Sequence, residues 1–418
     1  MRRLTTDDIL PKATRFGNRL PVVRWWLPVC LVVAVLIFIP TETVAESVEN
    51  SGSTYDLANL PWRLKRAMFE AAEQRDEHRY DQAAAVFNRL LLEHPESDHV
   101  LLRVYLGNDL MMADSIDAAL GHYQAGAALD SHYAAAWLGV GNAAYETGEF
   151  VRSAEAFSRA RRCGHQNSPQ VIYYIAAAWV MAERHQLAIP YLDELVSGQI
   201  APPELDWFRL LLTIQQELGL TSEAESTIVQ MISLFEDDPD CWQLIYQYAA
   251  VAGDYERSAV AKTITGYLRP LSRQETISLG DLYLSIGAAS RACDYYAEAL
   301  GDSANADEYE RYASAALAAR DGGKVEEILR LALSNEPTAR LWSLLGDHYY
   351  LEEEFQKSYD AFAESARLDE GEGRAFLMMA YNALAIGDLD KLSACVREVD
   401  RFSEYQKQAR ELEKQLVQ

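Results

Sequence analysis

Residues 342–362 read WSLLGDHYYLEEEFQKSYDAF and contain the clearest copy of a pattern that recurs along this chain. In chain order, its landmark residues are Trp342, Leu345, Gly346, Tyr349, Phe355, Ser358 and Phe362. Similar landmarks occur over residues 279–299 and 137–160. Self-similarity of this kind indicates a chain built from repeats.

The repeats share a small or substituted residue near the start of their second half, and this residue fixes their phase. It recurs every 33 to 36 residues, at Ala83, Ala119, Ser153, Ala188, Ala224, Ser258, Ala292, Val325, Ser358 and Leu392. A chain of 418 residues is also too long for one compact core, whereas a repeat array grows by addition. The sequence therefore predicts ten repeat units.

The pattern resembles the tetratricopeptide repeat (TPR), with Ser358 standing where that repeat has alanine. The resemblance implies an all-α fold, a superhelical solenoid of about ten helical hairpins. Residues 404–418 are expected to form a C-terminal capping helix whose polar outer face closes the array.

Each recurring residue type has a physical role in such a hairpin. Glycine in the first helix and the small residue in the second let the two helices approach closely. Aromatic residues such as Phe157 and Phe362 are expected to fill the space between successive hairpins, burying roughly 150–250 Å² each. Glycines at the turns, such as Gly148 and Gly253, supply a left-handed backbone conformation that other residues resist.

The array has an interruption near its middle. Residues 197–203 contain Gly198 and the pair Pro202-Pro203, and proline cannot continue a helix, so we expect a bend or linker there. In chain order, the predicted regions are a polar spacer at 46–59, an N-terminal TPR array at 60–196, the linker at 197–203, a C-terminal TPR array at 204–403 and the capping helix at 404–418.

Residues 1–45 read as a targeting segment. Six basic residues precede an apolar run at 25–39, and Ala45 follows in a small-residue context. As a helix that run would span roughly 22 Å, less than the ~30 Å hydrocarbon core. The segment is either a signal peptide cleaved after Ala45 or a retained membrane anchor. In both cases the rest of the chain is expected to lie in the periplasm.

The chain is strongly acidic. Its formal charge is −25, and removing residues 1–45, with six basic and three acidic side chains, makes it −28. Nucleic acid and anionic membrane surfaces would both be repelled, so neither is expected as a partner.

The cysteines suggest no metal or disulfide framework. Those downstream of the targeting segment are Cys163, Cys241, Cys293 and Cys395, and they fall in different repeats. Because a solenoid repeat touches only its neighbours, we expect mostly buried free thiols.

No constellation typical of catalysis is present. The sequence has no His-Glu-x-x-His motif, phosphate-binding glycine loop or Gly-x-Ser-x-Gly elbow, and its eight histidines are scattered. We therefore expect a non-enzymatic protein without a cofactor.

In TPR arrays the first helices line a groove that binds a peptide. The residues expected to point into it are Asn108, Leu138, Asn142, Tyr145, Tyr173, Gln243, Gln247, Asp281, Asp347, Tyr350 and Tyr381. A basic clamp on a terminal carboxylate is not expected, because Val104 and Leu138 stand where it would need lysine. The acidic and aromatic residues favour a ligand that carries Lys or Arg.

A narrower resemblance covers units five to seven, over residues 205–212, 241–244, 252–255 and 279–292. These stretches are similar to periplasmic TPR proteins associated with TonB–ExbB–ExbD energy-transduction systems. The resemblance implies a scaffold whose partners include TonB, ExbB, ExbD or an outer-membrane receptor. Two other functions remain open: a scaffold for envelope assembly or polysaccharide export, and a regulatory subunit of a cell-wall enzyme.

Overall fold

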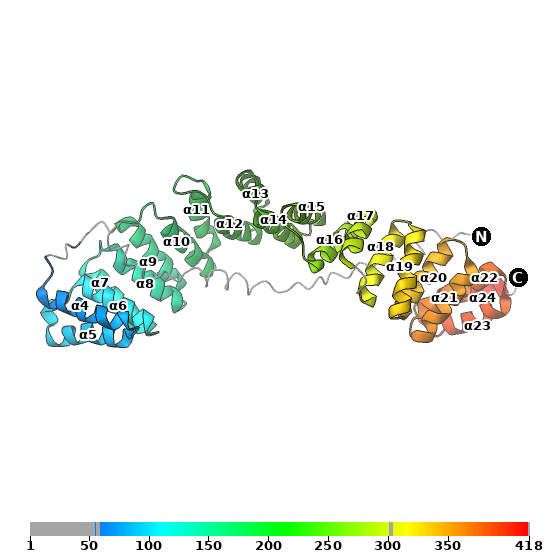
Figure 1. Ribbon diagram of the computed structural model, residues 1–418, viewed down its shortest axis with the longest axis horizontal. Helices are drawn as coiled ribbons and strands as arrows, with labels where there is room; N and C mark the ends of the chain where they lie inside the picture. Colours follow the sequence, from blue (N-terminus) through cyan, green and yellow to red (C-terminus); the bar gives the residue numbers. More distant parts are fainter. Residues whose placement is uncertain (1–54, 56–58, 301–303, 417–418) are drawn as a thin grey trace. The chain divides into compact units, whose positions relative to one another are not determined.

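The computed structural model describes residue 55, residues 59–300 and residues 304–416. Within these residues the chain forms helices joined by short turns, with no strand (Figure 1). The targeting segment and most of the predicted spacer at 46–59 lie outside the described residues, so those predictions stay predictions.

The helices have similar lengths, and their bounds follow the repeat. In chain order they are α4 (Trp62–Asp76), α5 (Tyr80–Glu93), the short 3-10 helix η2 (Pro95–Ser97), α6 (Val100–Met112), α7 (Ile116–Leu129), α8 (Ala134–Glu146), α9 (Phe150–Cys163), α10 (Pro169–Met181), α11 (His185–Val196), α12 (Leu205–Glu217), α13 (Thr221–Phe235), α14 (Pro239–Ala252), α15 (Tyr255–Leu268), α16 (Arg273–Ser285), α17 (Ala289–Leu300), α18 (Ala306–Ala318), α19 (Gly322–Asn335), α20 (Ala339–Leu351), α21 (Phe355–Leu368), α22 (Gly373–Ile386), α23 (Leu389–Val399) and α24 (Gln406–Leu416).

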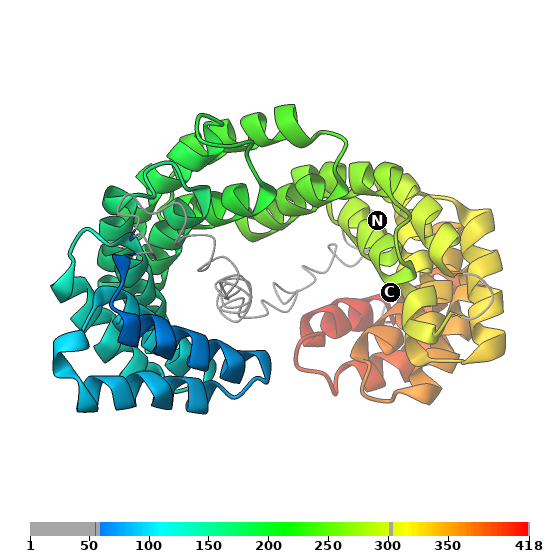
Figure 2. The ribbon, with the colours of Figure 1, turned by 60° about the vertical axis from the view of Figure 1, so that its left-hand side comes forward.

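The helices follow one another as ten consecutive pairs, from α4 with α5 to α22 with α23, and α24 follows the last pair. The two helices pack closely on each other in every pair except that of α12 and α13. We number these pairs hairpins 1 to 10 and call their members the first and second helix. Within hairpins 1 to 5, and separately within hairpins 6 to 10, each hairpin also packs against the next, as neighbouring pairs in Figures 1 and 2 show. The fold is an all-α TPR solenoid, as the sequence predicted, and α24 packs on α23 at its C-terminal end.

The turn inside every hairpin contains one residue with a left-handed backbone. These residues, with φ between 56° and 83°, are His78, Asp114, Gly148, Glu183, Gly219, Gly253, Gly287, Arg320, Glu353 and Gly387. Each lies five residues before a member of the small-residue series, which confirms the phase of all ten units. Half of these residues are not glycine, so the turn tolerates the conformational energy that a left-handed backbone costs a residue with a side chain.

The recurring glycine of the first helix lies directly under an aromatic ring of the second helix. A Cβ added to Gly141 would lie 2.6 Å from the ring of Phe157, and one added to Gly346 would lie 2.7 Å from that of Phe362. Phe157 also contacts Tyr174 of the next hairpin, with 5.5 Å between ring centroids. The ring therefore fills the space between hairpins, as predicted, and also requires glycine beneath it.

Serine at the small position makes a bond that alanine could not make. Ser153 donates to the carbonyl oxygen of Gly141 over 2.7 Å, and Ser358 donates to that of Gly346 over 2.8 Å. Both serines are fully buried. What the sequence shows as a departure from the repeat is thus an added link between the two helices.

Hairpin 6 departs from this arrangement. Tyr246 occupies the glycine position of its first helix, and Lys262 occupies the ring position of its second helix. Lys262 is 5% exposed, and its ammonium lies 4.5 Å from the centroid of the Tyr246 ring. Burial lowers the pKa of Lys262. A cation–π contact therefore replaces the glycine–ring contact here.

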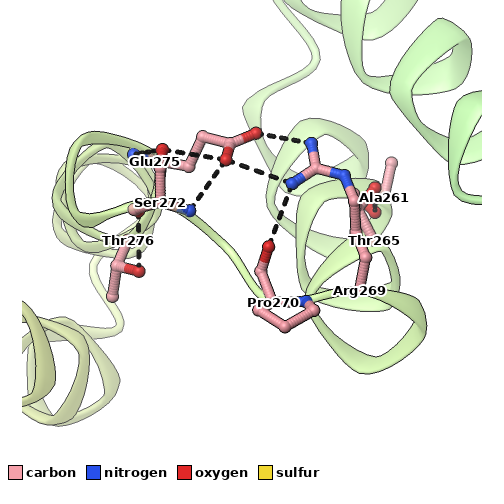
Figure 3. Close-up of polar contacts among 7 residues, drawn as sticks. All are labelled: Ala261, Thr265, Arg269, Pro270, Ser272, Glu275 and Thr276. Carbon is pink, nitrogen blue, oxygen red and sulfur yellow. Dashed lines mark hydrogen bonds and ion pairs between the residues drawn. The ribbon is translucent and has the colours of Figure 1, made fainter.

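An ion pair fixes the turn from hairpin 6 to hairpin 7 (Figure 3). Arg269 donates to both carboxylate oxygens of Glu275, over 2.6 and 3.1 Å. Glu275 also completes a capping box with Ser272 at the start of α16. The arginine and the capping bonds lower the pKa of Glu275 to about 2.

The chain divides into two compact units at the junction of Leu234 and Phe235, so that hairpins 1 to 5 belong to one unit and hairpins 6 to 10 to the other. Residues 197–203 connect α11 to α12 without helix, and Gly198 is left-handed there. The prediction that this connection also forms a bend or boundary stays a prediction.

Two further features bear on the sequence predictions. In the described part of the chain, Cys163, Cys241, Cys293 and Cys395 are free thiols, and all but Cys163 are buried. Among the same residues, every helix is too short or too polar to cross a membrane.

Candidate functional site

In two places the first helices of successive hairpins pack directly on one another: α6 on α8, and α18 on α20. Residues four and seven positions apart lie on one side of a helix. Leu138, Asn142 and Tyr145 therefore share a face of α8.

Five of the predicted site residues lie in hairpins 2 to 4. We call Asn108, Leu138, Asn142, Tyr145 and Tyr173 the first-helix face, because they stand at corresponding places on α6, α8 and α10. The two tyrosines and the leucine are almost fully buried, and the two asparagines are partly exposed. The face is uncharged. Burial, reinforced by nearby Asp206, raises the pKa of Tyr173 to about 12, which keeps its hydroxyl neutral.

The two asparagines differ in their bonding although both follow a recurring glycine. Asn108 accepts a hydrogen bond of 2.7 Å from the hydroxyl of Tyr123. The side-chain oxygen of Asn142 is sheltered from solvent and has no hydrogen-bond partner. An unpaired sheltered acceptor costs about 1–3 kcal/mol, so Asn142 is poised to accept a bond from a ligand.

Gln243 and Gln247 lie on α14, in the other compact unit. Both are partly exposed, and the side-chain oxygen of Gln243 is sheltered and unpaired like that of Asn142. Gln243 stands at the position of Leu138 in its own hairpin, whereas Gln247 stands at that of Asn142.

Asp281, on α16, is already engaged within the array. It accepts a 2.6 Å bond from the hydroxyl of Tyr296 and a 2.9 Å bond from Arg311 of the next first helix. Its carboxylate therefore ties hairpin 7 to hairpin 8.

Asp347 is engaged in the same way and is more deeply buried. Its side chain is 4% exposed, and Arg374 donates to it over 2.6 Å from the next first helix. Burial raises the pKa of Asp347, and the arginine opposes that shift. A third pair, Arg340 with Glu310, joins hairpins 8 and 9 over 2.9 Å.

Tyr350 and Tyr381 belong to the packing of hairpins 9 and 10. The Tyr350 ring meets Phe355 edge-on at 5.6 Å, and burial raises the pKa of Tyr350. Tyr381 packs against the core of the last hairpins. The structure thus distributes the predicted residues over both compact units, and those of the first-helix face form an uncharged set.

Sequence reasoning missed the arginine partners. Arg311 and Arg374 stand 30 and 27 residues after the aspartates that they bind. The signal was a charge of opposite sign about one repeat later, which can be read only once the repeat is in phase. No group of three or more His, Cys, Asp or Glu residues is arranged to hold a metal ion within the described residues.

Comparison with known proteins gives structural likeness only. No protein-family model and no curated protein matches the chain. Among solved structures, YrrB, a TPR protein with an unusual peptide-binding site, is 21% identical and has a TM-score of 0.36, over 45% of this chain and 94% of that chain. MamA is 19% identical with a TM-score of 0.35, over 38% of this chain and 91% of that chain.

A TPR protein from Parabacteroides merdae is 11% identical with a TM-score of 0.32, over 77% of this chain and 99% of that chain. At such identities these likenesses concern the fold alone. The TPR assignment rests on the repeat, the paired helices and the glycine–ring contacts.

Proposed function

We propose that this chain is a non-enzymatic scaffold that binds an extended segment of a partner protein along the first-helix face of hairpins 2 to 4. The observation that carries the proposal is the sheltered, unpaired side-chain oxygen of Asn142. It lies between Leu138 and Tyr145 on one side of α8. A backbone N–H of an extended peptide is the donor that would satisfy it.

The rest of the face suits the same ligand. Leu138, Tyr145 and Tyr173 are almost fully buried and give the face an apolar base, and Asn108 is held in place by Tyr123. Because the face carries no charge, an apolar or uncharged segment fits it better than the Lys- or Arg-bearing peptide expected from the sequence. Asp281 and Asp347, on which that expectation depended, are bound to arginines.

The test uses random peptides selected on phage against the full chain. Selected peptides should bind Asn142→Ala and Leu138→Ala about tenfold more weakly, since a buried hydrogen bond or apolar contact contributes ~1 kcal/mol or more. Asn88→Ala, on the second helix α5, makes the same chemical change away from the face and should bind as the unaltered chain does. Unchanged affinity for both face variants would refute the proposal.

We also propose that the protein works in the periplasm as an accessory of a TonB–ExbB–ExbD system. This finer assignment is supported only by the sequence resemblance of units five to seven and by the targeting segment at 1–45. Residues 1–60 should therefore activate a reporter that works only outside the cytoplasm.

Deleting residues 46–418 should impair TonB-dependent uptake and leave unrelated transport intact. Normal uptake, with TonB, ExbB and ExbD absent from crosslinks in the native envelope, would leave only the general scaffold function. A polysaccharide synthase, a porin or a cell-wall hydrolase among the crosslinks would then favour one of the two other functions.

A further inference from the structure

Helix α9 is a basic helix in an acidic protein. It carries Arg152, Arg159, Arg161 and Arg162 against a single acidic residue, Glu155, whereas the whole chain has a formal charge of −25. Arginines in the last turn stabilise a helix end, which accounts for Arg161 and Arg162. Arg152 forms an ion pair with Glu149 over 2.7 Å, whereas Arg159, which also stands earlier in the helix, lies over the Trp137 ring.

Two cavities in hairpins 2 to 4 flank this helix. One, of about 350 Å³, lies where α7, α8 and α9 meet. Ala127, Trp137, Val140 and Ala156 give it apolar walls, and the guanidinium of Arg159 covers the Trp137 ring at 4.5 Å from its centroid. Arg152 and Glu155 also line this cavity, which suits an aliphatic side chain from an acidic segment.

The other cavity, of about 430 Å³, lies between α9, α10 and α11. Its polar lining consists of hydrogen-bond donors and amides without a carboxylate: Ser158, Arg161, Arg162, Gln166, Asn167 and Tyr191. A lining of this kind suits a carboxylate.

Arg161 is held in place for such a role. It donates to Glu194 over 2.6 Å and to the carbonyl oxygen of Gln166 over 3.0 Å. Arg162 beside it is exposed to solvent. A ligand carboxylate would therefore meet one fixed and one adaptable guanidinium.

From this arrangement we infer that α9 and its two flanking cavities form a docking site for an acidic peptide segment of another protein. A leucine-like side chain occupies the cavity beside Trp137, and an aspartate or glutamate occupies the cavity beside Arg161 and Arg162. Neighbouring helices lie about 8–10 Å apart and an extended peptide advances ~3.3 Å per residue, so about three residues separate the two anchors.

This site is distinct from the first-helix face. On α8, Trp137 and Val140 are three residues apart and share a side of the helix, whereas Leu138, Asn142 and Tyr145 lie on another side. A scaffold with both sites can hold two partner segments at once. A second copy of this chain is a poor occupant, because two whole molecules with a formal charge of −25 repel each other, whereas a short segment brings only a few charges close to the arginines.

The experiment measures fluorescence anisotropy of a labelled probe with the full chain. The acidic probe is a short peptide in which leucines stand three residues from aspartate or glutamate. In a neutral counterpart Asn and Gln replace the acidic residues, and in a basic counterpart Lys replaces them. The acidic probe should bind at least about tenfold more tightly than either counterpart, because the arginines select for charge. Equal binding of the three probes, or failure of the acidic probe to bind, would overturn the inference.

Variants then locate the site. The double variant Arg159→Glu, Arg162→Glu should lower the affinity for the acidic probe by about tenfold or more. Both residues are exposed, and the substitutions reverse the charge beside the cavities. Arg66→Glu, an exposed arginine on α4, makes the same kind of charge change elsewhere and should have little effect. Unaltered helical circular dichroism would show that the double variant is folded.

A third variant separates this inference from the proposed function. Asn142→Ala should leave the acidic probe bound as before, even if it abolishes binding of the phage-selected peptides. Loss of the acidic probe in Asn142→Ala would show a single shared site and overturn the inference. So would self-association of the chain that disappears in the double arginine variant, because the occupant would then be a second copy.

Discussion

Hairpins 2 and 3 differ from hairpins 7 and 9 at one position, the residue that follows the recurring glycine of the first helix. In hairpins 2 and 3 it is Asn108 and Asn142, and in hairpins 7 and 9 it is Asp281 and Asp347. The aspartates bind arginines of the next hairpin, whereas the asparagines make no such link.

The difference shows that one position of the repeat can serve either assembly or recognition. A carboxylate there pairs with a cation, and the next first helix supplies it. A carboxamide needs no counter-charge, so its free bonding capacity remains for a ligand. Inferring function from a repeat position therefore requires knowledge of the neighbouring repeat.

Breaking the aspartate link should have the largest effect on stability. In Arg374→Met, Asp347 loses its partner while its side chain remains 4% exposed, and breaking a buried pair of this kind costs about 3–5 kcal/mol. Urea unfolding of the full chain measures the loss. Arg374→Met combined with Asp347→Leu removes both charges and should recover most of the stability.

The pH dependence of that variant has a definite sign. Burial already raises the pKa of Asp347, so the folded state binds a proton more readily than the unfolded state. Without Arg374 the pKa rises further. The deficit of Arg374→Met should therefore shrink as the pH falls and Asp347 becomes neutral, and a deficit that grows at lower pH would contradict the pairing.

The glycine–ring contact occurs both in hairpin 3 and in hairpin 9, so its disruption should lower the stability of the two hairpins by similar amounts. Gly141→Leu and Gly346→Leu place a side chain against rings that are fully buried, and overpacking costs about 1–3 kcal/mol. Gly121→Ala is the control, since a Cβ there meets nothing within 4 Å and should stabilise α7 slightly. Thermal unfolding compares the three variants, and similar midpoints for all of them would refute the close approach.

The ion pair and capping box at the turn between hairpins 6 and 7 should contribute about 1 kcal/mol to the free energy of unfolding. This is the usual value of a capping residue in a partly exposed ion pair. Glu275→Gln removes the charge that Arg269 binds. Because the folded pKa of Glu275 is about 2, below its usual value, the contribution is present above pH ~4.5 and is lost as the pH falls through about 2. Chemical unfolding across this range should converge for Glu275→Gln and the unaltered chain at the acidic end.

The fold could be predicted from the sequence because the same helical hairpin pattern occurs ten times. The spacing of the small residues gave the phase of every hairpin, and the left-handed turn residues confirm that phase. Position within the repeat also placed Leu138, Asn142 and Tyr145 on one side of α8.

The sequence was insufficient for the charges and the cavities. Whether an aspartate faces a ligand or an arginine depends on contacts between repeats. In hairpin 6, the replacement of the glycine–ring contact by the contact between Tyr246 and Lys262 is visible only when the two helices are paired. The cavities beside α9 form between hairpins, where no single repeat contains their lining.

The smallest effect on stability is expected at Asn142, and its contrast with Asn108 is the sharpest test of the comparison. Asn108→Ala leaves the buried hydroxyl of Tyr123 without its acceptor, which costs about 1–3 kcal/mol. Asn142→Ala removes an unpaired oxygen together with some packing contacts, and since these two effects oppose each other it should not lower stability. Urea unfolding of the two variants, run beside binding of the phage-selected peptides, separates the roles. If Asn142 is a ligand acceptor, its variant keeps stability and loses binding. Equal destabilisation by the two substitutions would mean that Asn142 has a structural partner, and the first-helix face would then lose the observation on which its assignment rests.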